Sequence, residues 1–145
     1  MKYFLALLLL FSFPLVAEER IELICDGTYT MITERNGKEI IQEELTIIID
    51  ETAMLVGNIK YDNSGYKKYE YSSDDFQLTE FNKFEIKENE FSFSHTQYLD
   101  GRTILTSTGQ LNRYTGKFSS RMYAKEKPSL DSRYEGICKK TKRAF

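Results

Sequence analysis

Two cysteines and a single histidine are the residues of this chain with the most distinctive chemistry. Cys25 and Cys138 lie near opposite ends of the sequence, and His95 lies between them in a run of alternating apolar and polar residues. Structural zinc sites usually take four Cys or His ligands, so these three residues make a poor metal set. A Ser-His-Asp triad would have to use His95, which shares the parity of Phe91 and Phe93. We therefore expect a buried or half-buried structural histidine, with no metal ion and no cofactor.

Other catalytic signatures are absent from the sequence. Asp74 and Asp75 are adjacent, so in a strand they would point to opposite faces and could not converge on one bond. The run of residues 62–65, DNSG, lacks the downstream spacing and closing Glu of a calcium loop. Neither a P-loop, a dinucleotide fingerprint nor an HExxH motif occurs. The sequence favours a protein that is not an enzyme.

The N-terminus has the pattern of a secretory signal peptide. Lys2 precedes an almost wholly apolar run over residues 3–16, and charged residues begin directly after Ala17. Such a run is shorter than the ~20 residues that a membrane-spanning helix needs. We expect residues 1–17 to be removed, and residues 18–145 to form one exported domain, periplasmic or extracellular, with no transmembrane segment.

Export determines how the cysteines are interpreted. Thiols oxidise in exported compartments, and Cys25 and Cys138 are the one available pair. We expect them to form a structural disulfide, which requires the first and last segments of the domain to touch. The formal net charge of −2 favours neither nucleic acid nor an anionic membrane as a partner.

Apolar residues recur with a period of two along most of the chain, which predicts strands. Turn signals at Asn36-Gly37, at residues 62–65 and at Asp100-Gly101 separate them. Residues 53–61 read as one strand with Leu55, Ile59 and Tyr61 on one face. Residues 72–81 fit either a short helix or a strand, and we prefer the strand. The count is about eight strands.

These features predict an all-β, single-domain antiparallel meander. A meander whose terminal strands are joined by a disulfide suits a small closed or nearly closed barrel, because closure removes both sheet edges. A β-sandwich is the alternative, since it can also bring the termini together.

Tyrosines suggest where such a domain would bind. Tyr66, Tyr69 and Tyr71 crowd one predicted hairpin beside Ser64. Tyrosine is enriched at interfaces, although aromatic residues also favour strands for packing reasons alone. We expect either core packing or a binding surface made of these residues. The predicted function is a binding module for a small apolar ligand or for an exported protein partner.

Two short stretches resemble the periplasmic C-type lysozyme inhibitors, which are small exported β-barrels. They are ICDG at residues 24–27 and SGYKKY at residues 64–69. Leu23 stands where that family has a tyrosine, and the chain has no tryptophan. In that family a Ser-Gly loop enters the lysozyme cleft. The resemblance therefore implies an inhibitor that uses the Ser64 loop, which is the alternative function.

Overall fold

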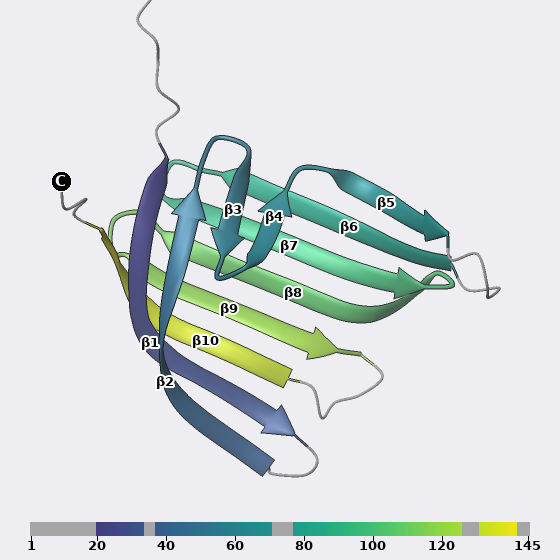
Figure 1. The fold of residues 1–145 in the computed structure, drawn as a ribbon, viewed down its shortest axis with the longest axis horizontal. Helices are drawn as coiled ribbons and strands as arrows, with labels where there is room; N and C mark the ends of the chain where they lie inside the picture. The colour runs from purple at the N-terminus through teal and green to yellow at the C-terminus, as the bar shows by residue number, and fades with distance from the viewer. Residues whose placement is uncertain (1–19, 34–36, 71–76, 126–130, 142–145) are drawn as a thin grey trace, which may run out of the picture.

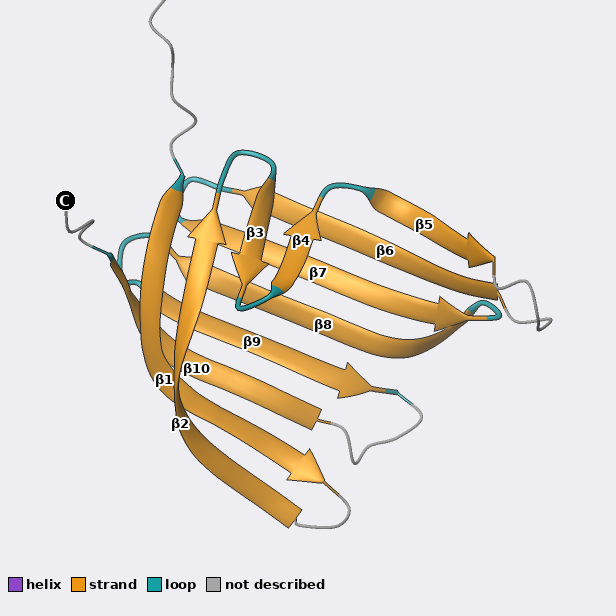
Figure 2. Cartoon of the chain, in the orientation of Figure 1, coloured by secondary structure: helices purple, strands orange, loops and turns teal. Residues whose placement is uncertain are grey.

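The computed structural model describes residues 20–33, 37–70, 77–125 and 131–141. Within these ranges the chain forms ten β-strands in one antiparallel sheet that is nearly closed into a barrel (Figure 1 and Figure 2). The strands are β1 (Ile21–Thr33), β2 (Gly37–Ile49), β3 (Ala53–Val56), β4 (Ile59–Asp62), β5 (Gly65–Glu70), β6 (Gln77–Ile86), β7 (Glu90–Leu99), β8 (Arg102–Asn112), β9 (Lys117–Ala124) and β10 (Asp131–Lys140). The predicted all-β barrel is confirmed.

The sheet order explains how the barrel closes. It runs β4-β3-β2-β1-β10-β9-β8-β7-β6-β5, so that β4 and β5 are the two edges and the first and last strands pair in the middle. Cys25 lies directly opposite Cys138 in that pair, and the two form a disulfide. The predicted disulfide is therefore confirmed, and it joins β1 and β10 at a pair of directly opposite residues.

The predicted number of strands was wrong, chiefly because residues 53–61 form a hairpin and not one strand. Gly57 adopts a positive φ of 59° and, with Asn58, makes the turn between β3 and β4. Glycine enters this conformation without steric cost, which suits it to a two-residue hairpin turn.

The hairpin also overturns the predicted face for this segment. Met54 pairs with Tyr61 and both are buried, whereas Leu55 pairs with Lys60 and Lys60 is exposed. Leu55 and Tyr61 therefore lie on opposite faces, because side chains alternate along each strand.

Residues 77–81 belong to the continuous strand β6, which confirms the strand interpretation for that part of residues 72–81. Several predictions concern segments outside the described residues. They are the signal peptide over residues 1–17, the turn residue Asn36, the tyrosine Tyr71, the helix-or-strand residues 72–76 and the aspartates Asp74 and Asp75.

The hydrophobic core occupies one end of the barrel, where β4 lies against β6 and β7. In Figure 1 the strands β3 and β4 lie in front of the left-hand parts of β6 to β8, whose right-hand ends extend beyond them. The ring of Tyr61 stacks on Phe93 at a centroid distance of 3.8 Å, and its hydroxyl lies 3.1 Å from Ser107 Oγ. The buried cluster comprises Leu23, Cys25, Ile47, Ile49, Met54, Tyr61, Phe84, Phe91, Phe93, Leu111, Phe118, Tyr134 and Cys138.

Glycines let aromatic rings lie close to the inner face of the sheet. A Cβ atom at Gly109 would collide with the ring of Phe93, and one at Gly27 would lie 2.7 Å from the ring of Tyr134. A larger residue at Gly109 would therefore displace the Phe93 ring, whereas one at Gly27 would also collide with the backbone of β10 at Glu135 and Gly136.

Candidate functional site

Polar side chains continue the inner face of β6 and β7 beyond the core. Phe84 and Phe93 are buried cross-strand partners, and the next inward pair is Asn82 with His95. Glu80 and Gln97 form the pair after that. Because side chains two residues apart share a face, all of these groups project into the barrel. We call Glu80, Asn82, His95 and Gln97 the inner polar cluster.

The carboxylate of Glu80 is the centre of this cluster. The Nε2 of Gln97 donates a hydrogen bond of 2.7 Å to Glu80 Oε1, and His95 Nε2 lies 3.9 Å from Glu80 Oε2. The side chains of His95 and Glu80 are 16% and 20% exposed. His95 is thus half-buried, as the sequence predicted, but its carboxylate neighbour was not foreseen. The parity of Glu80 with Phe84 is the signal that could have found it.

Asn82 supplies the least expected feature of the cluster. Its Oδ1 is buried and has no hydrogen-bond partner among the described residues. Almost all buried polar atoms in proteins are hydrogen-bonded, and an unpaired one costs free energy. The cluster therefore offers an acceptor that the protein itself does not satisfy.

Around the cluster, the inner face is apolar but only partly covered. The register places Leu105 beside Gln97, Ala124 beside Leu105, and Met122 beside Ser107, which is itself opposite His95. We call the partly exposed apolar side chains of this region the open inner face. They are Tyr29, Met31, Ile41, Tyr69, Leu78, Leu99, Leu105, Met122 and Ala124.

Of the predicted tyrosine surface, the structure describes Tyr66 and Tyr69, and it does not bring these two side chains together. Tyr66 pairs with Phe81 and is 69% exposed, whereas Tyr69 pairs with Leu78 and is 39% exposed. The two tyrosines lie on opposite faces of β5, because they are three residues apart in one strand. Tyr66 is on the outer face, where its ring lies 4.7 Å from that of Phe81.

The Ser64 loop connects the two edges of the sheet and is anchored on both sides. The backbone amide of Ser64 donates to Asp62 Oδ1 at 3.0 Å, and the amide of Phe84 donates to Asn63 Oδ1 at 2.8 Å. The hydrogen bond from Ser64 lowers the pKa of the Asp62 carboxyl. Ser64 itself is exposed, so this loop presents it from a fixed turn.

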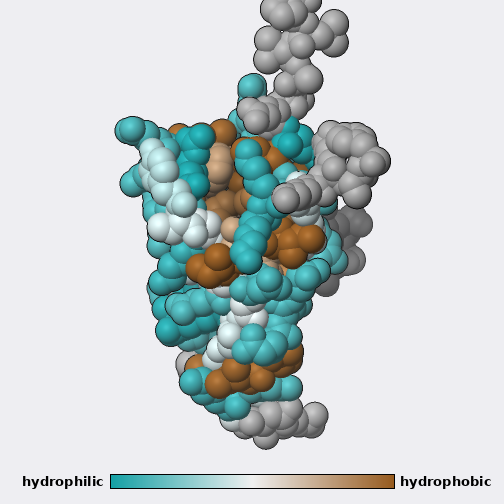
Figure 3. Space-filling view, turned by 90° about the vertical axis from the view of Figure 1, so that its left-hand side faces the viewer, coloured by the Kyte–Doolittle hydropathy of each residue, from teal (hydrophilic) through white to brown (hydrophobic). Residues whose placement is uncertain are grey.

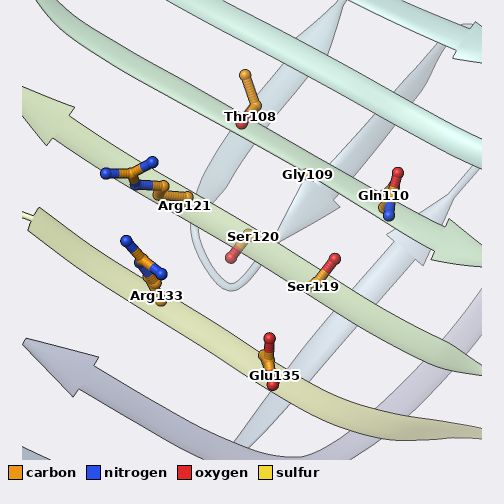
Figure 4. A pocket seen from close by; sticks show the side chains of 8 residues that line it. All are labelled: Thr108, Gly109, Gln110, Ser119, Ser120, Arg121, Arg133 and Glu135. Atoms are coloured by element: carbon orange, nitrogen blue, oxygen red, sulfur yellow. The ribbon is translucent and has the colours of Figure 1, made fainter.

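A polar groove of about 290 Å³ crosses the outer face of β8, β9 and β10 (Figure 4). Figure 4 shows Arg121 and Arg133 at one end of it, from neighbouring strands. Arg121 donates two hydrogen bonds of 2.9 Å to Asp131, and Arg133 donates one of 3.2 Å. Glu135 adds a second carboxylate to the lining. Both guanidinium groups are thus already paired, which leaves the groove no strong preference for an anion.

Another groove, of about 330 Å³, lies at the filled end of the barrel, where β1 begins and β10 ends. Figure 3 looks onto this end and shows apolar side chains in its hollow. Phe91 lines it, and the guanidinium of Arg113 lies 4.9 Å above the Phe91 ring. Arg113 also donates to the backbone oxygens of Lys87 and Glu88, so it stabilises the turns at this end.

In the part of the chain that the structure describes, no Ser-His-Asp arrangement forms around His95. Ser107 is its cross-strand neighbour, but the Ser107 hydroxyl is paired with the hydroxyl of Tyr61. A nucleophilic serine needs its hydrogen bond to the histidine base. Among the described residues, no group of three His, Cys, Asp or Glu side chains is arranged to hold a metal ion.

Comparison with known proteins gives no family: no family model matches the chain, and neither a curated protein nor a solved structure is significantly similar to it. The described residues also contain no helix long and apolar enough to cross a membrane.

Proposed function

We propose that this chain is an exported, non-enzymatic binding module that takes a small, largely apolar ligand on the open inner face. The signal-peptide pattern of residues 1–17 and the Cys25–Cys138 disulfide support export. The observation that carries the ligand hypothesis is the uneven filling of the barrel. One end is packed with buried aromatic rings, while the inner face beyond it keeps partly exposed apolar side chains.

Apolar burial would supply the affinity. Each Å² of apolar surface removed from water contributes ~25 cal/mol, so covering ~200 Å² of the open inner face contributes ~5 kcal/mol before the cost of association. The stacked rings of Tyr61 and Phe93 form the inner limit of the site. A ligand with one short hydrocarbon chain or ring system fits this amount of surface.

The test uses N-phenyl-1-naphthylamine, whose fluorescence rises in apolar surroundings, with two adjacent residues of β8. Leu105 points into the open inner face, whereas Thr106 points outward beside Tyr123. We expect Leu105→Glu to weaken probe binding at least tenfold and Thr106→Glu to leave it unchanged. Met122→Gln provides a milder inner-face change if Leu105→Glu fails to fold. Probe binding that is equal in wild type and all three variants contradicts the proposal.

The anchored Ser64 turn favours a second candidate, an inhibitor of an exported enzyme. Ser64 and the nearby Tyr66 are both exposed, and their backbone is fixed by Asp62 and by the adjoining strand β5 (Gly65–Glu70). If this corner enters a lysozyme cleft, the wild-type chain should slow lysis of bacterial cells by a C-type lysozyme. The double variant Ser64→Ala/Tyr66→Ala should then lose that effect, and Tyr114→Ala, another exposed tyrosine, should keep it. Full lysozyme activity at a large excess of wild-type chain excludes this candidate.

A further inference from the structure

The chemistry of the inner polar cluster points to the class of ligand. We infer that the ligand of the open inner face carries a hydrogen-bond-donating head group, an alcohol or a primary ammonium group, and not a carboxylate. This inference rests on the proposed function, and it adds what the polar end of the ligand must be.

Acceptor oxygens are in excess within the cluster. Asn82 Oδ1 is buried without a partner among the described residues. Glu80 Oε1 accepts from Gln97, but Glu80 Oε2 lies 3.9 Å from His95 Nε2, which is beyond hydrogen-bond distance. A donor placed between Asn82 and Glu80 would satisfy the Asn82 oxygen once that side chain turns toward it, and would hydrogen-bond Glu80 Oε2.

The buried hydroxyl groups next to the cluster are already used within the protein. Ser107 is the cross-strand neighbour of His95, and its hydroxyl pairs with that of Tyr61 at 3.1 Å. A ligand carboxylate would need several donors to replace its hydration, and the cluster itself would offer only the His95 imidazole and the amide groups of Asn82 and Gln97, of which Gln97 already donates to Glu80.

The carboxylate nearest the proposed head group also disfavours an anion. Glu80 projects inward within the cluster, whereas the cations on the same face, Lys67 opposite Glu80 and Arg102 opposite Leu99, are exposed. The charge of Lys67 also lowers the pKa of Asp62. A ligand carboxylate next to Glu80 would meet a like charge, whereas an ammonium group would meet an opposite one.

The cross-strand pairs of β6 to β9 also determine how the ligand would lie. The Asn82–His95 pair directly adjoins the buried Phe84–Phe93 pair, so the head group would sit at the inner limit of the site. The register then leads from His95 to Ser107 and to Met122, so the apolar part would cross β8 and β9.

Three amphiphiles with the same dodecyl chain test the inference, because dodecanol, dodecylamine and tridecanoate differ in the head group alone. Each displaces N-phenyl-1-naphthylamine from the wild-type protein at pH 7.5, and its dissociation constant is derived from the displacement curve. We expect dodecanol and dodecylamine to bind about tenfold more tightly than tridecanoate, since one added hydrogen bond to a buried acceptor is worth about that factor.

Two cluster variants identify the residues responsible. Asn82→Leu should reduce the advantage of dodecanol over tridecanoate to less than threefold. Glu80→Gln, which keeps the side-chain volume, should weaken dodecylamine and leave dodecanol nearly unchanged. Thr108→Leu on the outer face is the control and should preserve all three constants. If Asn82→Leu fails to fold, Glu80→Gln alone decides.

The outcomes separate this inference from the proposed function. If tridecanoate displaces the probe as well as or better than dodecanol does, the head-group inference is overturned and ligand binding stands. If the probe does not bind, or none of the amphiphiles displaces it, the proposed function fails and this inference fails with it.

Discussion

Tyr61 holds the edge strand β4 against the rest of the barrel, and its hydroxyl should be energetically coupled to that of Ser107. Tyr61 is 4% exposed and Ser107 is 7% exposed, so neither hydroxyl has ready access to water. Tyr61→Phe leaves the Ser107 hydroxyl buried without its partner, which costs about 1–2 kcal/mol. Ser107→Ala leaves the Tyr61 hydroxyl in the same position and should cost a similar amount.

The double variant removes both hydroxyls and therefore leaves no buried hydroxyl without a partner. We expect its free energy of unfolding to exceed the additive expectation by about 1 kcal/mol or more, since directly contacting residues couple in this range. Urea denaturation followed by circular dichroism measures all four proteins. Tyr114→Phe is the matched control, because Tyr114 is 75% exposed, and it should change stability by less than about 0.5 kcal/mol.

Strict additivity of the two single variants would refute the coupling, and with it the role of this hydrogen bond in closing the barrel. A Tyr61→Phe variant as stable as wild type would do the same. Tyr61→Ala measures separately what the ring contributes, because the ring stacks on Phe93. Loss of the ring should lower the free energy of unfolding by about 3–5 kcal/mol, as for other buried aromatic truncations.

Further predictions concern the disulfide, the ionisable groups and the outer tyrosine. Replacing Cys25 and Cys138 together by Ser should lower the free energy of unfolding by about 2–5 kcal/mol, measured by thermal melting, and an unchanged melt would contradict the structural role of the bond. Hydrogen bonds from Arg121 lower the pKa of Asp131, so its stabilisation is present above the unfolded pKa of about 3.9 and is lost as pH falls through the folded value. Asp131→Asn should therefore destabilise the protein at pH 7 and have no effect at pH 2, and equal effects at both would exclude this cause. Burial raises the pKa of Tyr61, so stability should fall above about pH 10, and Tyr61→Phe should unfold less steeply in alkali. Tyr66→Ala should alter the melting temperature little, because Tyr66 is 69% exposed, and a large drop would place it in the core.

The alternation of residues along the chain predicted which side chains face inward in most strands. Phe91, Phe93 and His95 share the inner face of β7, and Ile47 and Ile49 are buried in β2, as period-two patterns indicate. The hairpin over residues 53–61 was missed because apolar residues occur on both sides of its turn. A tight turn of two residues with a positive φ at Gly57 leaves little trace in an apolar pattern.

The candidate site was harder to predict than the fold, because it depends on register. Parity within β6 places Glu80 on the inner face, but only the pairing with β7 places it beside Gln97 and His95. Those contacts join residues that are up to 17 positions apart. Tyr66 and Tyr69 differ in parity and lie on opposite faces of β5. Their closeness in the chain is the reason that a shared surface was predicted.

The separation of packing from polar chemistry along the barrel axis suggests that stability and binding are carried by different residues. The short strands β3 and β4 cover one end, where they contribute Met54 and Tyr61 to the core. A strand pair of that length cannot reach the far ends of β6 to β9, which are twice as long or more. The inner face there stays partly exposed, and substitutions on it remove fewer packing contacts than substitutions at the filled end. The Asn82 oxygen, which has no partner in the described part of the chain, lowers stability, so a ligand that satisfies it would stabilise the folded chain by binding to it alone.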